Sequence, residues 1–212
     1  MKKIVTILSA AMMLLAGTSA FAQLSVGAGY VNSVDYTKIG NESTKSTTGN
    51  GFYAGVSYTA PLPAGFSFTP GLYYEFLTAD VAAGNSLFVI GGRETEHYIN
   101  VPLDFSYGFD LSRDLHFFVF AGPTVNVGLA STTKVSAASA GISAQIGVIN
   151  NYDGNDYGRF DIMLGGGIGL EFRKNFRVNI GYDFGLLNRY TGKASNNSLH
   201  SNRLAAGLAF IF

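Results

Sequence analysis

The amino-acid sequence predicts an all-β protein, namely an eight-stranded antiparallel up-and-down transmembrane β-barrel. Three observations lead to this prediction. Apolar residues recur at every second position along eight separate segments, and a period of two is that of a β-strand. Long and short connections alternate between those segments, as they do in outer-membrane barrels. The last segment, Arg203 to Phe212, alternates regularly up to a terminal aromatic residue.

The first 22 residues have the pattern of a secretory signal peptide. Two lysines precede an apolar run from Ile4 to Leu15, and the segment Ala20 to Ala22 supplies the small residues of a cleavage site. The run is shorter than the roughly 20 residues that a spanning helix needs, which argues against an N-terminal membrane anchor. We therefore expect a signal peptide at 1–22 and one barrel domain at 23–212.

Composition narrows the possible partners. The sequence has no cysteine, which excludes a lipoprotein anchor at the cleavage site and a disulfide framework. Two of the 14 basic residues lie in the signal peptide, so 12 remain against 14 acidic residues, and no basic block suggests nucleic acid. The 27 glycines, 17 phenylalanines and 12 tyrosines suit a membrane barrel. No later apolar run is long enough for a transmembrane helix.

The eight segments share one design, an apolar face that alternates with a small or polar one. In the first, Leu24, Val26, Ala28 and Tyr30 form the apolar face, with serine and glycine between them. The same alternation recurs through the chain. The segments span residues 24–31, 52–58, 66–76, 98–107, 116–129, 160–172, 176–184 and 203–212.

The connections between these segments indicate an up-and-down barrel. Polar stretches rich in serine, threonine and asparagine predict long loops, whereas proline, glycine and charged residues predict tight turns. The long loops are expected at 33–50, 78–95, 131–156 and 188–201, and the turns at 61–65, 109–114 and 173–175. Both ends of the mature chain then lie on the side of the short turns, which is expected to be periplasmic.

The lysines favour a membrane barrel over a soluble one. All five that follow the signal peptide lie in predicted loops or turns, whereas a water-facing strand surface would carry several. The less apolar face carries mainly small and polar residues, which suit the narrow interior of an eight-stranded barrel. The apolar faces are therefore expected to face lipid. Pro70, Pro102 and Pro123 conflict with regular strands, and bulges at these positions are one explanation.

The segments around those prolines carry a family likeness. TPGLYYEF at 69–76, YINVPLDFSYGF at 98–109 and FVFAGPTVNVG at 118–128 resemble small porin-family barrels of the PorT-like group, as do GIGLEF at 167–172 and NIGYDFGLLN at 179–188. More coarsely, the chain resembles the OmpX and OmpA barrels. The resemblance implies an outer-membrane barrel, with Phe212 as part of the signal that the barrel-insertion machinery reads.

No segment predicts an enzyme, a metal site or a cofactor. His200 and Ser201 suggest a lipid A-modifying Ser/His pair, but adjacent strand residues point to opposite faces. His97 and His116 are expected near opposite ends of the lumen. Oxygen-bearing residues at 151–156 suggest calcium but lack the glycine and glutamate of an EF-hand. The glycine run from 165 lies within a strand and precedes no helix, so it is not a phosphate loop.

Three functions remain open at this point. The first is a barrel for envelope integrity or the passage of very small solutes, and the second is surface binding through the long loops. A lipid A-modifying enzyme is the third and least favoured. Outer-membrane lipid, lipopolysaccharide and the insertion machinery are the expected partners, and the barrel is expected to be a monomer.

A charge network is predicted to fill the lumen. The turn at 173–175 places Glu171 opposite Arg177, and both belong to the inward face. Further charges share that face. The whole predicted network is Glu75, Asp104, Arg159, Asp161, Glu171, Arg177, Asp183 and Arg203.

Outward aromatic residues are predicted to form two girdles at the two membrane interfaces. Those near the outer interface are Tyr30, Tyr74 and Phe76. Those near the periplasmic interface are Phe66, Tyr107, Phe117, Phe172, Phe176 and Phe212.

Overall fold

The computed structural model describes residues 23–40, 42–84, 89–139, 142–153, 157–192 and 196–212, so the predicted signal peptide lies outside the described residues. Within these ranges the chain forms nine β-strands and a short 3₁₀ turn, η1 (Pro63–Gly65). The strands are β1 (Gln23–Ile39), β2 (Glu42–Pro61), β3 (Phe66–Gly84), β4 (Val89–Ser112), β5 (Leu115–Ser139), β6 (Ile142–Asn150), β7 (Phe160–Phe172), β8 (Phe176–Gly185) and β9 (Ser198–Ile211). No helix of the described residues is long and apolar enough to cross a membrane.

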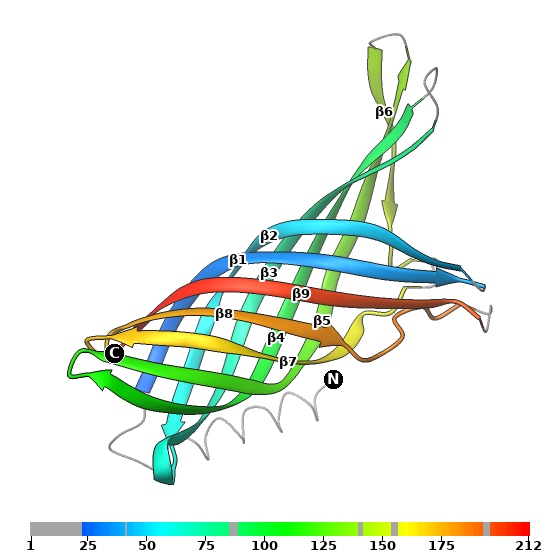
Figure 1. Cartoon of the computed structure of the whole chain (residues 1–212). Coiled ribbons are helices and arrows are strands. Elements are labelled where there is room, and N and C mark those ends of the chain that lie inside the picture. The colour runs from blue at the N-terminus through cyan, green and yellow to red at the C-terminus, as the bar shows by residue number, and fades with distance from the viewer. Residues whose placement is uncertain (1–22, 41, 85–88, 140–141, 154–156, 193–195) are drawn as a thin grey trace.

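Eight of these strands form a closed antiparallel ring. The order is β4-β3-β2-β1-β9-β8-β7-β5, and the pairing of β4 with β5 closes it. β6 pairs with β5 only among the described strands and lies outside the ring (Figure 1). The last strand pairs with the first from Ser25 with Ile211 to Lys38 with Ser198. The predicted eight-stranded up-and-down barrel is therefore confirmed.

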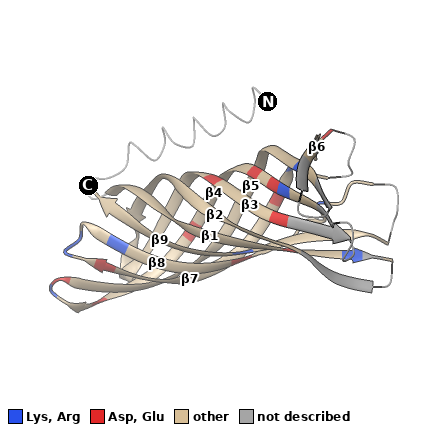
Figure 2. Ribbon diagram, turned by 90° about the horizontal axis from the view of Figure 1, so that it is seen from above, with Lys and Arg blue, Asp and Glu red and all other residues tan. Residues whose placement is uncertain are grey.

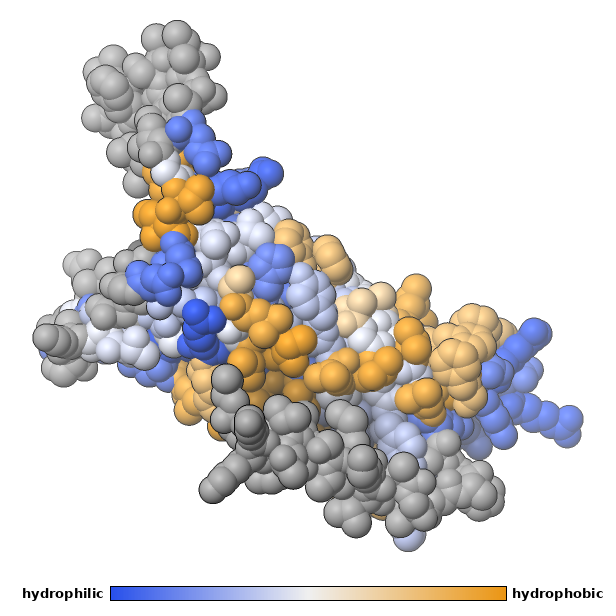
Figure 3. All heavy atoms as spheres, turned by 180° about the vertical axis from the view of Figure 1, so that it is seen from behind, coloured by the Kyte–Doolittle hydropathy of each residue, from blue (hydrophilic) through white to orange (hydrophobic). Residues whose placement is uncertain are grey.

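The outward face of the ring is an apolar belt, as the alternation predicted. Every outward position in the belt is apolar, aromatic, glycine or proline. The belt covers residues 24–30, 52–60, 66–76, 99–109, 117–129, 160–172, 176–184 and 204–212. Large side chains such as Val178 and Leu208 are 52% and 65% exposed there, which suits contact with lipid and not with water. In Figure 3 the apolar residues gather between hydrophilic ends.

The strands are longer at one end of the barrel than predicted. The proposed loops at 33–50, 78–95 and 131–156 were wrong, because β1 and β2, β3 and β4, and β5 and β6 continue through them as paired hairpins. Period-two alternation detects a strand that separates lipid from lumen. Beyond the apolar belt the outward face is polar as well, so strands rich in threonine and serine lose that signal while keeping their backbone hydrogen bonds. Figure 1 shows these hairpins projecting from the ring.

We call this end, with the β8–β9 connection, the hairpin end, and the opposite end the turn end. The turn end holds the β2–β3, β4–β5 and β7–β8 turns and both Gln23 and Phe212. In the β7–β8 turn, Arg173 and Lys174 have positive φ angles of 51° and 62°. The N–H of Asn175 donates to the carbonyl of Phe172 at 3.2 Å. This tight turn places Glu171 opposite Arg177, as predicted.

The three prolines do not produce bulges at their positions. On either side of Pro70, Pro102 and Pro123 the strand register is unchanged, so the suggestion of bulges was wrong. Instead, some rungs of the ladder are missing, because proline has no N–H to donate. Beside Pro70, the pairing of β2 with β3 is interrupted between Ser57 and Ala60. There the hydroxyl of Thr69 donates to that of Thr59 at 3.2 Å and joins the two strands instead.

The nine predicted girdle residues lie on the outward face. At the turn end the rings of Phe66 and Tyr107 lie 5.0 Å apart, and the ring of Phe176 lies 5.4 Å from that of Phe210. Phe212, 71% exposed, contacts Phe210 edge to face. The outward placement of these rings is therefore confirmed, and they extend the apolar belt to both of its rims.

Candidate functional site

Polar side chains form three layers inside the barrel. Each contains one arginine: Arg189 in the mouth layer at the hairpin end, Arg203 in the middle layer, and Arg177 in the base layer near the turn end. The order follows from the register, because Arg177 lies beside the β7–β8 turn whereas Arg203 pairs with Asp183 farther along β8. Figure 2 shows acidic positions within the barrel strands as well as at their tips.

The middle layer is built around the ion pair between Arg203 and Glu75. Nη1 of Arg203 lies 3.0 Å from Oε1 of Glu75, and each side chain is 4% exposed. The amide nitrogen of Asn100 donates to Oε2 of Glu75 at 2.8 Å, and Asn100 is hydrogen-bonded to Asn126. The ring of Tyr98 lies 4.6 Å from Cζ of Arg203. This layer therefore joins β3, β4, β5 and β9 across the lumen.

The base layer is built around Arg177 and Glu171. Nε and Nη2 of Arg177 both donate to Oε1 of Glu171, at 2.9 and 2.6 Å. Nη2 also donates to the hydroxyl of Thr59 on β2 at 3.3 Å. Because Thr59 is bonded in turn to Thr69, the chain of contacts crosses from β7 and β8 to β2 and β3.

The mouth layer is built around Arg189, which the β8–β9 connection directs into the barrel. Its side chain is 2% exposed. Nη1 donates to the hydroxyl of Ser201 and Nη2 to that of Tyr98, both at 2.9 Å. Its Cζ also lies 4.4 Å from the ring centre of Tyr157. The guanidinium thus occupies the lumen between β4, β9 and the connection that leads into β7.

Hydroxyl groups link Arg189 to a carboxylate. The hydroxyls of Tyr98 and Tyr157 both donate to Oε1 of Glu96, at 2.5 and 2.9 Å. Glu96 attracts Arg189 electrostatically, as does Asp35. These carboxylates compensate its charge, and the hydroxyl of Tyr98 joins Arg189 to Glu96 by two successive hydrogen bonds.

Two further carboxyl groups lie at the mouth beyond the apolar belt. Burial, followed by repulsion from Glu96, raises the pKa of Asp35 to about 6. Burial, followed by repulsion from Glu96 and Asp35, raises the pKa of Glu94 to about 7. Arg189 favours the charged form of both groups but does not offset these effects. The mouth therefore contains carboxyl groups that titrate near neutral pH.

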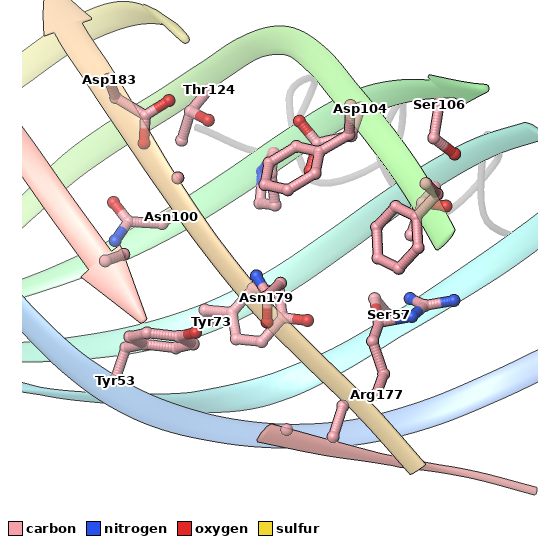
Figure 4. Close-up of a pocket in the computed structure, with 18 of the residues that line it drawn as sticks. Tyr53, Ser57, Tyr73, Asn100, Asp104, Ser106, Thr124, Arg177, Asn179 and Asp183 are labelled. Carbon is pink, nitrogen blue, oxygen red and sulfur yellow. The ribbon is translucent and has the colours of Figure 1, made fainter. Parts of the chain in front are cut away.

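A cavity of about 180 Å³ lies between the middle and base layers. Asp104 on β4 and Asp183 on β8 line it on one side, and Tyr53 and Tyr73 line it on the other (Figure 4). The two carboxylates repel each other electrostatically, and Arg177 attracts that of Asp104. The space enclosed by the barrel is thus reduced to a small polar chamber.

The structure places most of the predicted network inside the barrel. Seven of the eight residues lie on the inward face. They are Glu75, Asp104, Asp161, Glu171, Arg177, Asp183 and Arg203. Asp161 is buried at the mouth, where its Oδ1 accepts a hydrogen bond from the backbone N–H of Leu187 at 3.2 Å.

The placement of Arg159 in the lumen was wrong. Arg159 is exposed, its Cζ lies 4.1 Å from the ring centre of Tyr152, and Nη1 donates to the carbonyl of Leu129 at 3.0 Å. The reason is that β7 begins at Phe160, so strand parity does not extend to Arg159.

The mouth layer was missed from the sequence because its residues lie beyond the regular alternation. Asp35 and Glu94 fall in segments that were predicted to be loops, and Glu96 lies between the predicted loop at 78–95 and the predicted strand at 98–107. Once β4 is known to begin at Val89, its period-two pattern would place Glu94 and Glu96 on the inward face. Arg189 belongs to an irregular connection, and no sequence pattern indicates that its side chain enters the lumen.

The candidate catalytic and metal-binding residues do not come together. The ring of His200 contacts the carbonyl of Gly185, whereas Ser201 is buried in the lumen with Arg189. Asn151 binds Glu94 through its amide nitrogen at 2.6 Å. Of the other residues considered as calcium ligands, Asn155 and Asp156 lie outside the described residues, and the described part of the chain contains no group of three side chains placed to hold a metal ion.

Comparison with known proteins gives one family and several distant structures. The family described as outer membrane protein beta-barrel domain matches residues 19–191. The attachment invasion locus protein Ail of Yersinia pestis is 14% identical, covering 90% of this chain and 99% of that one, with a TM-score of 0.40. Neisserial surface protein A is 16% identical, with 90% and 99% coverage and a TM-score of 0.40. The outer membrane enzyme PagL is 16% identical, with 86% and 97% coverage and a TM-score of 0.43. No curated protein matches.

Proposed function

The chain belongs to the outer membrane protein β-barrel domain family, and from this membership we propose that it is a closed barrel that supports the envelope and passes at most very small solutes. In this proposal it is a porin-family protein of the PorT-like group, exported by a signal peptide and monomeric. Its turn end and both termini face the periplasm. Outer-membrane lipid, lipopolysaccharide and, during biogenesis, the insertion machinery are its partners.

The arginine-centred layers carry this proposal. Arg189 and Arg203 occupy the lumen at the mouth and in the middle, and both are almost fully buried. Arg177 bridges opposite walls at the base. An eight-stranded barrel is just wide enough for its inward side chains. These layers leave no continuous path through the lumen for solutes such as glucose or a disaccharide.

A swelling assay with liposomes tests solute passage. Purified protein is inserted into liposomes, which are then placed in solutions of glycine, glucose or a disaccharide. We expect little or no swelling with glucose and the disaccharide. Rapid swelling with glucose would contradict the closed barrel, and an empty-liposome preparation supplies the baseline.

Surface binding is a second candidate, favoured by the β5–β6 hairpin. This hairpin extends from the ring, and the outer edge of β6 pairs with no other described strand. Val148 and Ile149 on β6 are 58% and 45% exposed. An unpaired edge with exposed apolar residues can accept a strand from another protein.

A shortened hairpin separates this candidate from the first. Lys134 and Val148 are paired, so residues 135–147 can be replaced by an Asn-Gly turn between them. If the hairpin is the binding element, the variant inserts normally but no longer captures extracellular partners in a pull-down. Equal capture by the variant and the unaltered protein would exclude the hairpin as the binding element.

Our proposal contains no enzymatic activity. The two histidines considered as catalytic residues have other partners. His97 is hydrogen-bonded to the hydroxyl of Tyr74 at 2.5 Å, and His116 is hydrogen-bonded to Asp110 at 2.8 Å. His200 and Ser201 lie on opposite faces of β9, so they cannot act as a pair.

A further inference from the structure

We propose that the cavity between the middle and base layers is a binding site for a small organic cation, such as an ammonium group on a short apolar chain or ring. The inference rests on the closed lumen of the proposed function but requires no transport. Binding and passage are measured separately, so either can fail without the other.

The charges around the cavity do not balance. Four carboxylates line it, and the two arginines there are already engaged, Arg203 with Glu75 and Arg177 with Glu171. The carboxylates of Asp104 and Asp183 accept no hydrogen bond and form no direct ion pair among the described residues. Arg203 attracts Asp183 only as a more distant charge. Two neighbouring carboxyl groups in a narrow lumen relieve their repulsion by binding a proton or another cation.

Glycines let these two carboxylates approach the same row of the wall. Gly122 pairs with Gly165, and Gly165 pairs with Asp183, so two inward positions without side chains lie in one row across β5, β7 and β8. A Cβ at Gly165 would lie 2.0 Å from Oδ1 of Asp183, and one at Gly122 would lie 2.2 Å from the carbonyl oxygen of Leu103. The carboxylate of Asp183 therefore lies directly over Gly165, and a side chain at that position would displace it from the cavity wall.

A buried carboxylate of the middle layer also lines this cavity. Glu75 is 3% exposed, and its Oε1 lies 3.0 Å from Nη1 of Arg203 without a well-aligned hydrogen bond among the described residues. An N–H donor of a ligand would give this oxygen the hydrogen bond that the ion pair does not supply.

The walls suit an organic ligand. The rings of Tyr53 and Tyr73 meet edge to face at 5.6 Å, opposite Asp104 and Asp183 (Figure 4). Aromatic faces attract cations as well as apolar groups. The cavity of about 180 Å³ slightly exceeds an engineered cavity of about 150 Å³ that holds benzene. Because the described residues include no metal-holding group, a metal ion fits less well.

The cavity extends past Arg177 and Glu171 of the base layer toward the turn end, and a ligand would enter beside that layer. Its lining includes Ser67, Ser106 and His116, which lie near the β2–β3 and β4–β5 turns. His116 is bonded to Asp110, whose side chain is 81% exposed at that rim. An exposed carboxylate at the entrance attracts cations. The opposite direction is blocked by the middle and mouth layers.

Titration calorimetry with benzylammonium chloride tests the proposal. Benzylammonium combines one positive charge with one ring, and benzyl alcohol is its neutral counterpart. The refolded unaltered barrel is titrated in detergent with each compound at constant ionic strength. We expect saturable binding of benzylammonium and at least about tenfold weaker binding of benzyl alcohol. Absence of saturable benzylammonium binding, or equal binding of both compounds, would overturn the proposal.

Charge-neutralising variants locate the site. The double variant Asp104→Asn and Asp183→Asn should weaken benzylammonium binding at least about tenfold, whereas Asp114→Asn in the exposed β4–β5 turn should not. Both variants are first checked for the heat-dependent gel mobility of a folded barrel. Unchanged affinity in a folded double variant would contradict the site. If the double variant does not fold, a spin-labelled ammonium probe is added to the unaltered protein. Paramagnetic relaxation of the NMR signals of Tyr53 and Tyr73 would place the probe in the cavity, and its absence would contradict the site.

Discussion

At the scale of the residue, single arginines join strands that are not neighbours in the ring. Arg177 contacts β7 and β2, and Arg203 reaches from β9 to β3. A guanidinium carries five N–H donors in one plane, so it can serve several acceptors at once. Lysine would offer a point charge on a flexible stem and could not reproduce these contacts.

Replacing Arg177 by alanine is expected to destabilise the barrel. Glu171 would lose its ion-pair partner while only 16% exposed, and breaking a desolvated pair costs roughly 3–5 kcal/mol, less where water enters. The measurement is the urea midpoint of unfolding in detergent micelles. Arg113→Ala in the exposed β4–β5 turn serves as the control. Equal midpoints for the two variants would contradict a stabilising role for the pair.

The carboxyl groups of the mouth predict a pH dependence. The pKa of Glu94 is raised from 4.5 to about 7 and that of Asp35 from 3.8 to about 6, so the folded protein binds these protons more tightly than the unfolded chain. Stability should therefore increase as the pH falls from about 7 toward about 4. For Glu94 alone the gain is about 1–3 kcal/mol, allowing for solvent screening. Urea midpoints measured across this range should depend less on pH in Glu94→Gln, and a pH-independent unaltered protein would refute the assignment.

At the scale of the element, the sequence predicted the strands where they separate two environments and missed them elsewhere. Apolar alternation located all eight strands of the ring, because each has one face toward lipid and one toward the lumen. The extensions of β3, β4 and β5 were missed because their outward face is polar, so apolar and polar positions no longer alternate there. Strand parity predicted the lumen residues correctly except for Arg159, which precedes β7. Arg189 could not be predicted, since the path of an irregular connection depends on tertiary contacts.

The closing strand predicts a defect in assembly. The backbone N–H of Phe212 donates to the carbonyl of Leu24 at 2.9 Å, and its ring contacts Phe210. Deleting Phe212 should leave export intact but reduce insertion into the outer membrane. The check is the ratio of protein in outer-membrane and periplasmic fractions, with Phe66→Leu as a control that removes an outward aromatic from another strand. A full outer-membrane yield of the truncated chain would contradict a role for Phe212 in insertion.

At the scale of the whole molecule, two features define the barrel: an apolar belt outside and arginine-centred layers inside. The belt could be predicted in full, because alternate residues of each strand face outward. The layers could be predicted only in part, since the sequence specifies which face a charge lies on but not which partner it meets across the lumen. The pair of Glu171 and Arg177 was predictable because a tight turn sets its register.

The mouth layer should be the part of the lumen that opens most readily. Arg189 comes from a connection and not from a barrel strand, so Arg189→Ala removes its guanidinium without altering the ring. We expect this variant to show more frequent brief openings in a planar bilayer than Arg159→Ala, which removes an exposed arginine. Identical traces would indicate that the middle and base layers alone control the lumen.

The most direct test of the closed barrel is the conductance of the unaltered protein in a planar lipid bilayer. The three layers leave only a small chamber between them, so we predict no large, steady conductance and at most small, transient openings. Heat-dependent gel mobility of the same sample confirms that the protein is folded. A large and steady conductance from folded, unaltered protein would contradict the closed lumen.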